Sequence, residues 1–261
     1  GHMWNFPEDN TPAVITAHRH IESAQANEKL SLPQTAVLFY MHGGEAFVRK
    51  NYKTRLISKR FPRFLASCPV YRLRHHPLCF LDGGRGAPQA VDTLETLAAL
   101  GVQNVICVGM CGVFAGGLTC GDILIPSKAF VEEGSSLHYF PSITFSQPDQ
   151  VLHQMALQTI FGAKDLPIVS TDAVYRQTFF KENLWRGQGA AGVDMETSAL
   201  FSVGAFLKMH VVSVLVASDV HPLAQGEESW QWKLSGNMRK AFFDKCVGFA
   251  LNVADGCGNL L

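Results

Sequence analysis

The sequence predicts an α/β fold in which helices cover a sheet with parallel strands. Buried strands, glycine turns and amphipathic helices follow one another in the order that is typical of βαβ units. Hydrophobic residues make up 47% of the 261 residues and charged residues only 17%, which favours a large buried core. We expect one domain over residues 4–261, since a chain of this length is commonly one α/β unit, and we interpret residues 1–3 as an expression-tag scar.

The first half of the chain carries three predicted strands, at residues 36–41, 78–81 and 105–109. Helices are expected at 21–29, from residue 45 onward, and at 87–100. The last of these is the clearest, because Ala90, Leu94, Leu97 and Leu100 are spaced as one helical face and Gly101 is placed to end it.

The second half continues the same alternation. Strands are predicted at 122–126, 129–132, 166–170 and 211–217, and helices at 151–161, 195–208 and about 229–253. Residues 134–136 and 171–177 are predicted loops. Neither internal repeats nor low-complexity segments interrupt this pattern.

Four predicted strands run directly into short polar or glycine turns, at residues 42–44, 83–86, 109–112 and 218–219. Parallel strands bring their carboxyl ends to one edge of a sheet, which is where open α/β sheets bind ligands. The sequence therefore predicts a ligand site at this edge.

The charge balance favours a small-molecule ligand. Lys plus Arg and Asp plus Glu number 22 each, so no overall field attracts nucleic acid or an anionic membrane. The longest apolar runs, 36–41 and 211–217, fall short of the roughly 20 residues that cross a bilayer, and no secretory segment is recognised. We expect a cytoplasmic protein with no membrane or nucleic-acid partner.

The seven cysteines are an odd number and are scattered through apolar sequence. Cys107 and Cys111 have a spacing that suggests a metal or redox site, but no second Cys or His pair accompanies them. Buried packing is the favoured interpretation, because free Cys packs well in cores. We expect no metal and no organic cofactor.

A series of segments in the same order resembles the nucleoside phosphorylase and nucleosidase superfamily, of the purine and uridine phosphorylase type. The segments are 84–88, 105–112, 121–126, 133–139, 170–175, 193–201 and 214–219. The resemblance implies a single-domain three-layer α/β/α fold with a mixed, partly barrel-like central sheet. It also implies cleavage of an N-glycosidic bond and assembly into a homo-oligomer, a dimer or a hexamer.

Met195 and Glu196 match the family's Met-Glu pair, in which the Met packs on the sugar and the Glu accepts hydrogen bonds from ribose hydroxyls. The chemistry agrees, because a carboxylate beside the ribose favours an oxocarbenium-like sugar. The alternative is that Glu196 only begins a helix, where its charge suits the helix dipole.

Asp219 stands where purine-cleaving relatives protonate or hydrogen-bond the purine N7, which favours a purine base. Ser218, beside it, is a further substrate contact. The alternative is that Ser218 and Asp219 only cap the loop before Pro222.

Further substrate contacts follow from the same resemblance. They are Met110, Cys111 and Gly112 in the third turn, Thr171, Asp172, Arg176 and Gln177 in the base-pocket segment, and His138 in the Ser-rich loop. A polar loop needs no ligand to explain it, and His138 is equally compatible with a surface position.

The phosphate site departs from the family. Phosphorolysis requires cationic and hydroxyl donors, yet Cys107 and Met110 stand where relatives place an Arg and a Ser or Thr. The first turn, with Gly43 and Glu45, also lacks the relatives' Arg. We expect Arg85, between two glycines, to bind phosphate with Gly43 and Ser136, and with Arg49 or an Arg of a neighbouring subunit.

The sequence thus favours a purine nucleoside phosphorylase that uses inorganic phosphate as co-substrate. The first alternative is a nucleosidase in which Glu45 activates water. A second alternative is a sensor that binds a nucleoside without cleaving it, which the presence of both Glu196 and Asp219 disfavours.

Overall fold

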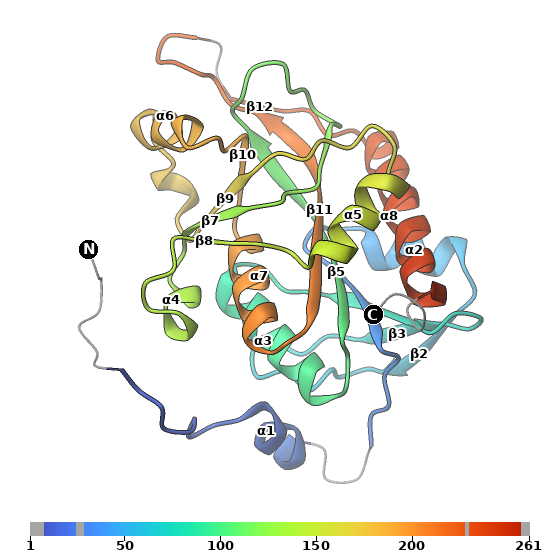
Figure 1. The fold of residues 1–261 in the computed structure, drawn as a ribbon. Helices are drawn as coiled ribbons and strands as arrows, with labels where there is room; N and C mark the ends of the chain where they lie inside the picture. The colour runs from blue at the N-terminus through green and yellow to red at the C-terminus, as the bar shows by residue number, and fades with distance from the viewer. Residues whose placement is uncertain (1–7, 25–28, 228–229, 257–261) are drawn as a thin grey trace.

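The computed structural model describes residues 8–24, 29–227 and 230–256, and these form one mixed sheet of twelve strands with helices around it (Figure 1). The strands are β1 (Thr35–Phe39), β2 (Thr54–Ser58), β3 (Val70–Leu73), β4 (Leu78–Asp82), β5 (Asn104–Val113), β6 (Ile123–Leu124), β7 (Ala129–Glu132), β8 (Phe145–Ser146), β9 (Ile168–Thr171), β10 (Gly192–Asp194), β11 (His210–Val220) and β12 (Gln231–Trp232). The helices are α1 (Ala17–Ala24), α2 (Gly44–Asn51), α3 (Ala87–Ala99), α4 (Ser135–Tyr139), α5 (Gln150–Thr159), α6 (Phe179–Gly187), α7 (Thr197–Phe206) and α8 (Gly236–Gly256), with the 3-10 turn η1 (Val174–Arg176).

The four strands that were expected to share an edge are parallel neighbours. β1 pairs in parallel with β4 and with β5, and β5 pairs in parallel with β11 along its whole length. Their carboxyl ends therefore lie at one edge of the sheet, as predicted.

Helices cover both faces of these strands, which confirms the three-layer α/β/α arrangement (Figure 1). In β1, Ala36 and Leu38 pack with α3 and α7, whereas Val37 and Phe39 pack with α2, α5 and α8. Alternate side chains of a strand point to opposite faces, so a strand buried on both faces appears in sequence as a continuous apolar run.

Strand β5 pairs with different strands along its length. Residues 104–108 pair with β1, whereas Gly112 and Val113 pair antiparallel with β10, and β11 runs along the other side of the whole strand. The neighbour of β5 thus changes just before its carboxyl end, and the sheet is mixed as the resemblance implied.

Three of the predicted turns and loops are wrong. Residues 109–112 continue β5 rather than turning, and residues 218–219 continue β11 beyond a register shift between Ala217 and Asp219. Residues 135–139 form α4, whose first turn is closed because the Glu133 carboxylate accepts the Ser136 N–H.

Several element boundaries also differ. The last helix begins at Gly236 instead of about residue 229, because β12 first pairs with β11; residues 228–229 lie outside the described part. The predicted helix 21–29 is α1, at Ala17–Ala24, and residues 25–28 are not described. Strands β2, β3, β8 and β10 and helix α6 were not predicted. In the described ranges, no helix is both long and apolar enough to span a membrane.

The close packing of α7 on β11 gives a test of the layer arrangement. A Cβ added at Gly204 would lie 2.5 Å from Cγ2 of Val211, whereas one added at Gly248 in α8 would meet nothing within 4 Å. We expect Gly204→Ala to lower the free energy of unfolding by about 1–3 kcal/mol through overpacking. Gly248→Ala should raise it by about 0.5–1 kcal/mol, because Ala is the better helix former. Urea unfolding of both variants measures this, and a neutral Gly204→Ala would contradict the packing.

Candidate functional site

The carboxyl end of β5 lies between two acidic segments. Gly112 pairs with Asp219 of β11 on one side and with Val193 of β10 on the other, and β10 leads directly into Asp194, Met195 and Glu196. Burial raises the pKa of the Cys111 thiol, and the carboxylates of Asp194 and Asp219 both raise it further. Cys111 therefore lies close to both acidic segments, which are residues 194–196 and residue 219.

Glu196 is a buried carboxylate held at the start of α3. The residue is 8% exposed, and its Oε2 accepts the Gly86 N–H at 2.7 Å. Gly86 precedes α3 with a φ of 81°, a left-handed conformation that glycine adopts without strain. Burial raises the pKa of Glu196 to about 8, and the neighbouring Asp194 contributes to the rise.

Asp194, which the sequence analysis did not single out, anchors this segment. It accepts hydrogen bonds from Ser170 Oγ at 2.6 Å and from Thr197 Oγ1 at 2.5 Å, and it also accepts the Thr197 N–H. Burial raises the pKa of Asp194 to about 6. Asp194 lies two residues before the N-cap residue of α7, Glu196, so its contact with the first N–H of the helix is not the usual capping pattern that a sequence reveals. The anchor fixes Met195 and Glu196 between β10 and α7.

Asp219 is surrounded by donors. Its carboxylate accepts hydrogen bonds from Ser218 Oγ at 2.6 Å, His221 Nε2 at 2.9 Å and Trp230 Nε1 at 2.5 Å. Burial acts to raise the pKa of Asp219, but these hydrogen bonds together hold it below the ordinary value. Asp219 is therefore ionised at neutral pH and cannot itself be a proton donor there.

His221 carries the proton of this group. Its Nε2 faces Asp219 and its Nδ1 lies 2.8 Å from Glu182 Oε2 of α6, which is 6% exposed. Burial acts to lower the pKa of His221, but the hydrogen bonds to the two carboxylates raise it to about 9. Sequence reasoning missed His221 and Glu182, although residues 219 and 221 are two apart on an extended segment and so share a face.

The turn after β1 contributes a second carboxylate with an altered pKa. Glu45, in the first turn of α2, has its Oε1 atom buried with no hydrogen-bond partner in the described ranges. Burial raises the pKa of Glu45 to about 7, and Asp82 at the end of β4 adds to the rise. A half-buried carboxyl group with this pKa has the properties of a general base at neutral pH.

Arg85 lies at the same edge, but its charge is engaged. Its Nη1 donates to the Gly84 carbonyl at 2.7 Å and lies 3.2 Å from the Asp82 carboxylate. Arg49 stacks on the Tyr71 ring instead, 4.7 Å from the ring centre. A cation that sequence reasoning did not find, Arg239 of α8, donates to the His42 carbonyl at 2.7 Å, next to Gly43.

The remaining predicted residues differ in their burial and in their contacts. Ser136 is fully buried, with its hydroxyl bonded to Glu133 and Ser202, so it is engaged inside the protein. Thr171 is buried and follows Ser170, which pairs with Asp194. Asp172 accepts the Gly134 N–H. His138, Asp172 and Arg176 are exposed, Gln177 and Met110 are half-buried, and Cys111 is buried.

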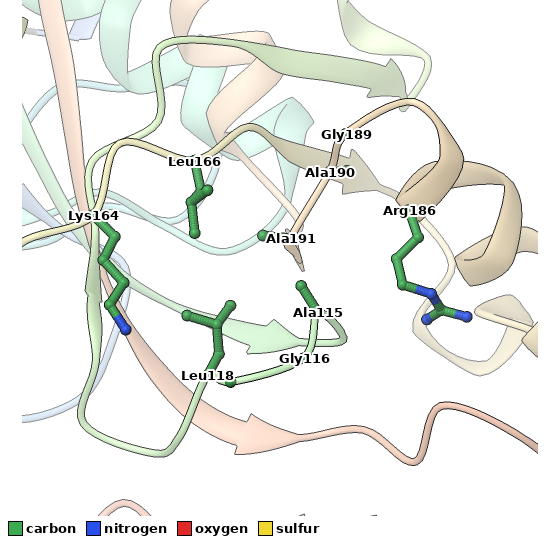
Figure 2. A pocket seen from close by; sticks show the side chains of 10 residues that line it. Ala115, Gly116, Leu118, Lys164, Leu166, Arg186, Gly189, Ala190 and Ala191 are labelled. Atoms are coloured by element: carbon green, nitrogen blue, oxygen red, sulfur yellow. The ribbon is translucent and has the colours of Figure 1, made fainter.

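A separate cavity of about 490 Å³ lies between the loop after β5 and the approach to β10 (Figure 2). Its walls are mostly small or apolar, and its two cations are engaged: Lys164 with Asp122 at 3.2 Å and Arg186 with the Phe114 carbonyl. None of the predicted site residues lines it. Across the described ranges, no group of three or more His, Cys, Asp or Glu side chains is arranged to hold a metal ion.

Comparisons with known proteins point to one family. The family model described as "Phosphorylase superfamily" matches residues 43–255. A DeoD-type purine nucleoside phosphorylase of Brevibacillus brevis is 29% identical over 177 residues, which are 66% of this chain and 72% of the relative. A guanosine phosphorylase of Halorubrum lacusprofundi is 27% identical over 48% of this chain and 54% of its own. The fold of an AMP nucleosidase from Bacteroides thetaiotaomicron matches 94% of this chain and all of its own, with 19% identity and a TM-score of 0.72.

The buried charge of Glu196 predicts a stability that depends on pH. Because its pKa is raised from 4.5 to about 8 on folding, its contribution to stability is present below about pH 4.5 and is lost as pH rises toward 8. We expect Glu196→Gln to gain stability relative to the unaltered protein over this window, by at most about 1.4 kcal/mol per pH unit. Urea unfolding at pH 5 and pH 8 measures the difference. Glu22→Gln, at an exposed position of α1, is the control, and an equal effect of pH on all three proteins would contradict the assignment.

Proposed function

The chain belongs to the Phosphorylase superfamily, and from that premise we propose that it cleaves the N-glycosidic bond of a purine nucleoside with water as the attacking group. The observation that carries the proposal is the placement of two acidic segments, residues 194–196 and 219, on either side of the end of β5. In the proposal, residues 194–196 bind the sugar and Asp219 interacts with the base.

In this proposal Glu196 accepts hydrogen bonds from the ribose hydroxyls and Met195 packs on the sugar ring. The Gly86 N–H and the Asp194 anchor hold Glu196 in place before the substrate arrives. A preorganised carboxylate stabilises positive charge that develops on the sugar at little cost of reorganisation. Burial strengthens that interaction, because solvent screens it less.

Asp219 and His221 together interact with the departing base. Asp219 is ionised and accepts three hydrogen bonds, so we assign the transferable proton to His221 Nε2, 2.9 Å from the Asp219 carboxylate. Glu182 fixes the imidazole from its other nitrogen at 2.8 Å. Proton transfer from His221 to purine N7 makes the base a better leaving group. The names of the relatives, purine nucleoside and guanosine phosphorylases, support a purine.

Charge at the first turn favours water over phosphate as the attacking group. Arg85 is already paired with Asp82, and Glu45 adds a further carboxylate that would oppose a phosphate dianion. The unpartnered Glu45 Oε1 instead suits a water molecule, which it would orient and deprotonate. Ser136, buried within α4 with its hydroxyl bonded to Glu133 and Ser202, offers no donor to an anion.

Phosphorolysis remains the second candidate, and two observations favour it. The sequence relatives carry the names of phosphorylases, and Arg239 places a guanidinium beside Gly43, where sequence reasoning found no cation. If Arg85 exchanges Asp82 for phosphate, Arg85 and Arg239 would be the two cations available at this edge.

The attacking group is tested by a panel of purine and pyrimidine nucleosides, assayed with and without phosphate. We expect release of purine and free ribose at the same rate in both conditions. Glu45→Gln should lower kcat by about 10²–10⁴-fold, because the general base is lost. Saturation by phosphate with formation of ribose 1-phosphate would establish phosphorolysis instead, and nucleoside binding without base release would indicate a sensor.

The proton donor is tested by the pH profile of kcat/KM. Glu45 and Glu196 must be deprotonated and His221 protonated, so activity should fall as the pH drops below about 8 and again as it rises above about 9. We expect His221→Gln to lower the rate and to remove the fall at high pH. The control is His210→Gln, which breaks another His–Asp pair at the opposite end of β11, 2.9 Å from Asp149. A fall near pH 9 that persists in His221→Gln would contradict the role of His221.

A further inference from the structure

Positive charge is concentrated in one continuous part of the chain. Residues 46–81 contain nine Lys and Arg and no Asp or Glu, although the whole chain has 22 of each kind. This segment covers most of α2 and nearly all of the β2, β3 and β4 part of the sheet, including the edge strand β2. The zero net charge of the chain therefore conceals a basic region at one end of its sheet.

Three arginines of this region line one groove. Arg55 of β2 lies directly opposite Arg72 of β3 in the antiparallel register, and Arg74 and His75 follow in the next turn. Together they line a groove of about 470 Å³. Within the described ranges, no Asp or Glu lies within ion-pair distance of these three guanidinium groups.

The placement of these arginines lowers the stability of the fold when no anion is bound between them. Like charges directly opposite each other on a strand pair repel, and this costs stability. Arg72 is nevertheless held in position, because its Nε donates to the Leu73 carbonyl at 3.1 Å and its Nη2 donates to the His76 carbonyl at 3.4 Å. A positioned guanidinium with free N–H groups is suited to bidentate contact with phosphate oxygens.

The groove is distant from the candidate active site. Arg74 and His75 lie in the turn before β4, whereas the end of β4 at Asp82 contacts Arg85 at the catalytic edge. The five residues of β4 separate the two ends by roughly 16 Å at the usual rise of a strand. A ligand in the groove would therefore occupy a second site.

We propose that this groove binds the oligophosphate chain of a small anion, such as a nucleoside triphosphate or inorganic tripolyphosphate. Three arginines match several adjacent phosphate groups, and the volume is that of a small-molecule site. A nucleic-acid site would track a longer basic path, whereas this groove is lined by four residues. The proposal is independent of the reaction at the catalytic edge.

The test is calorimetric titration of the full chain with tripolyphosphate and, separately, with ATP. We expect Arg55→Ala/Arg74→Ala to weaken binding at least tenfold. The control Lys50→Ala/Lys59→Ala removes two exposed charges from the same segment but outside the groove, and should weaken binding less than twofold. Glu196→Gln should bind as the unaltered protein does, because the active site is not involved. Circular dichroism checks that each variant is folded.

The outcomes separate the alternatives. Equal weakening in the two double variants would show a general field and overturn the site, as would the absence of binding. A single-stranded oligonucleotide that binds more tightly than both small anions would also overturn it. Tighter binding of ATP than of tripolyphosphate, lost in the groove variant, would identify a nucleotide as the ligand, and the reverse order would identify a simple oligophosphate. Arg74→Lys should weaken binding several-fold, because Lys keeps the charge but loses the forked donor.

Discussion

The burial of carboxylates at the end of β5 is the constraint on which the rest of the site depends. Burying a carboxylate costs free energy unless hydrogen-bond donors surround it, and each carboxylate here has its own donors. Gly86 donates its N–H to Glu196, Ser170 and Thr197 enclose Asp194, and His221, Ser218 and Trp230 enclose Asp219. The glycine turn before α3, the start of α7 and Trp230, just before β12, are thus all part of one electrostatic arrangement.

The surroundings of the ionisable groups in the site shift their pKa values in different directions. Glu45 and Glu196 have raised pKa values because burial opposes their charge, whereas Asp219 is held ionised by its donors and His221 is held protonated between two carboxylates. Groups whose environments shift their pKa values in opposite directions are the expected basis for a division into acid and base. In the proposed reaction, this division assigns the base to Glu45, after β1, and the acid to His221, after β11.

Sequence reasoning found the parallel strands because each is a continuous apolar run buried on both faces, as Val37 and Leu38 illustrate. It missed β2 and β3 because an Arg-rich strand pair at the sheet edge, with Arg55 opposite Arg72, shows no apolar alternation. Glu196 and Asp219 were identified from the resemblance, whereas His221 was not, because only the tertiary structure reveals Glu182 on its other side. Arg85 was expected to be available for phosphate, yet Asp82, three residues earlier in the same turn, pairs with it.

A crystal structure of the Glu45→Gln variant with a purine nucleoside bound would show directly whether the two acidic segments hold one substrate. We expect ribose hydroxyls within hydrogen-bond distance of the Glu196 carboxylate and the purine ring beside Asp219 and His221, in one cleft at the end of β5. A nucleoside bound elsewhere, for example in the cavity of Figure 2, with Glu196 and Asp219 both untouched, would contradict it.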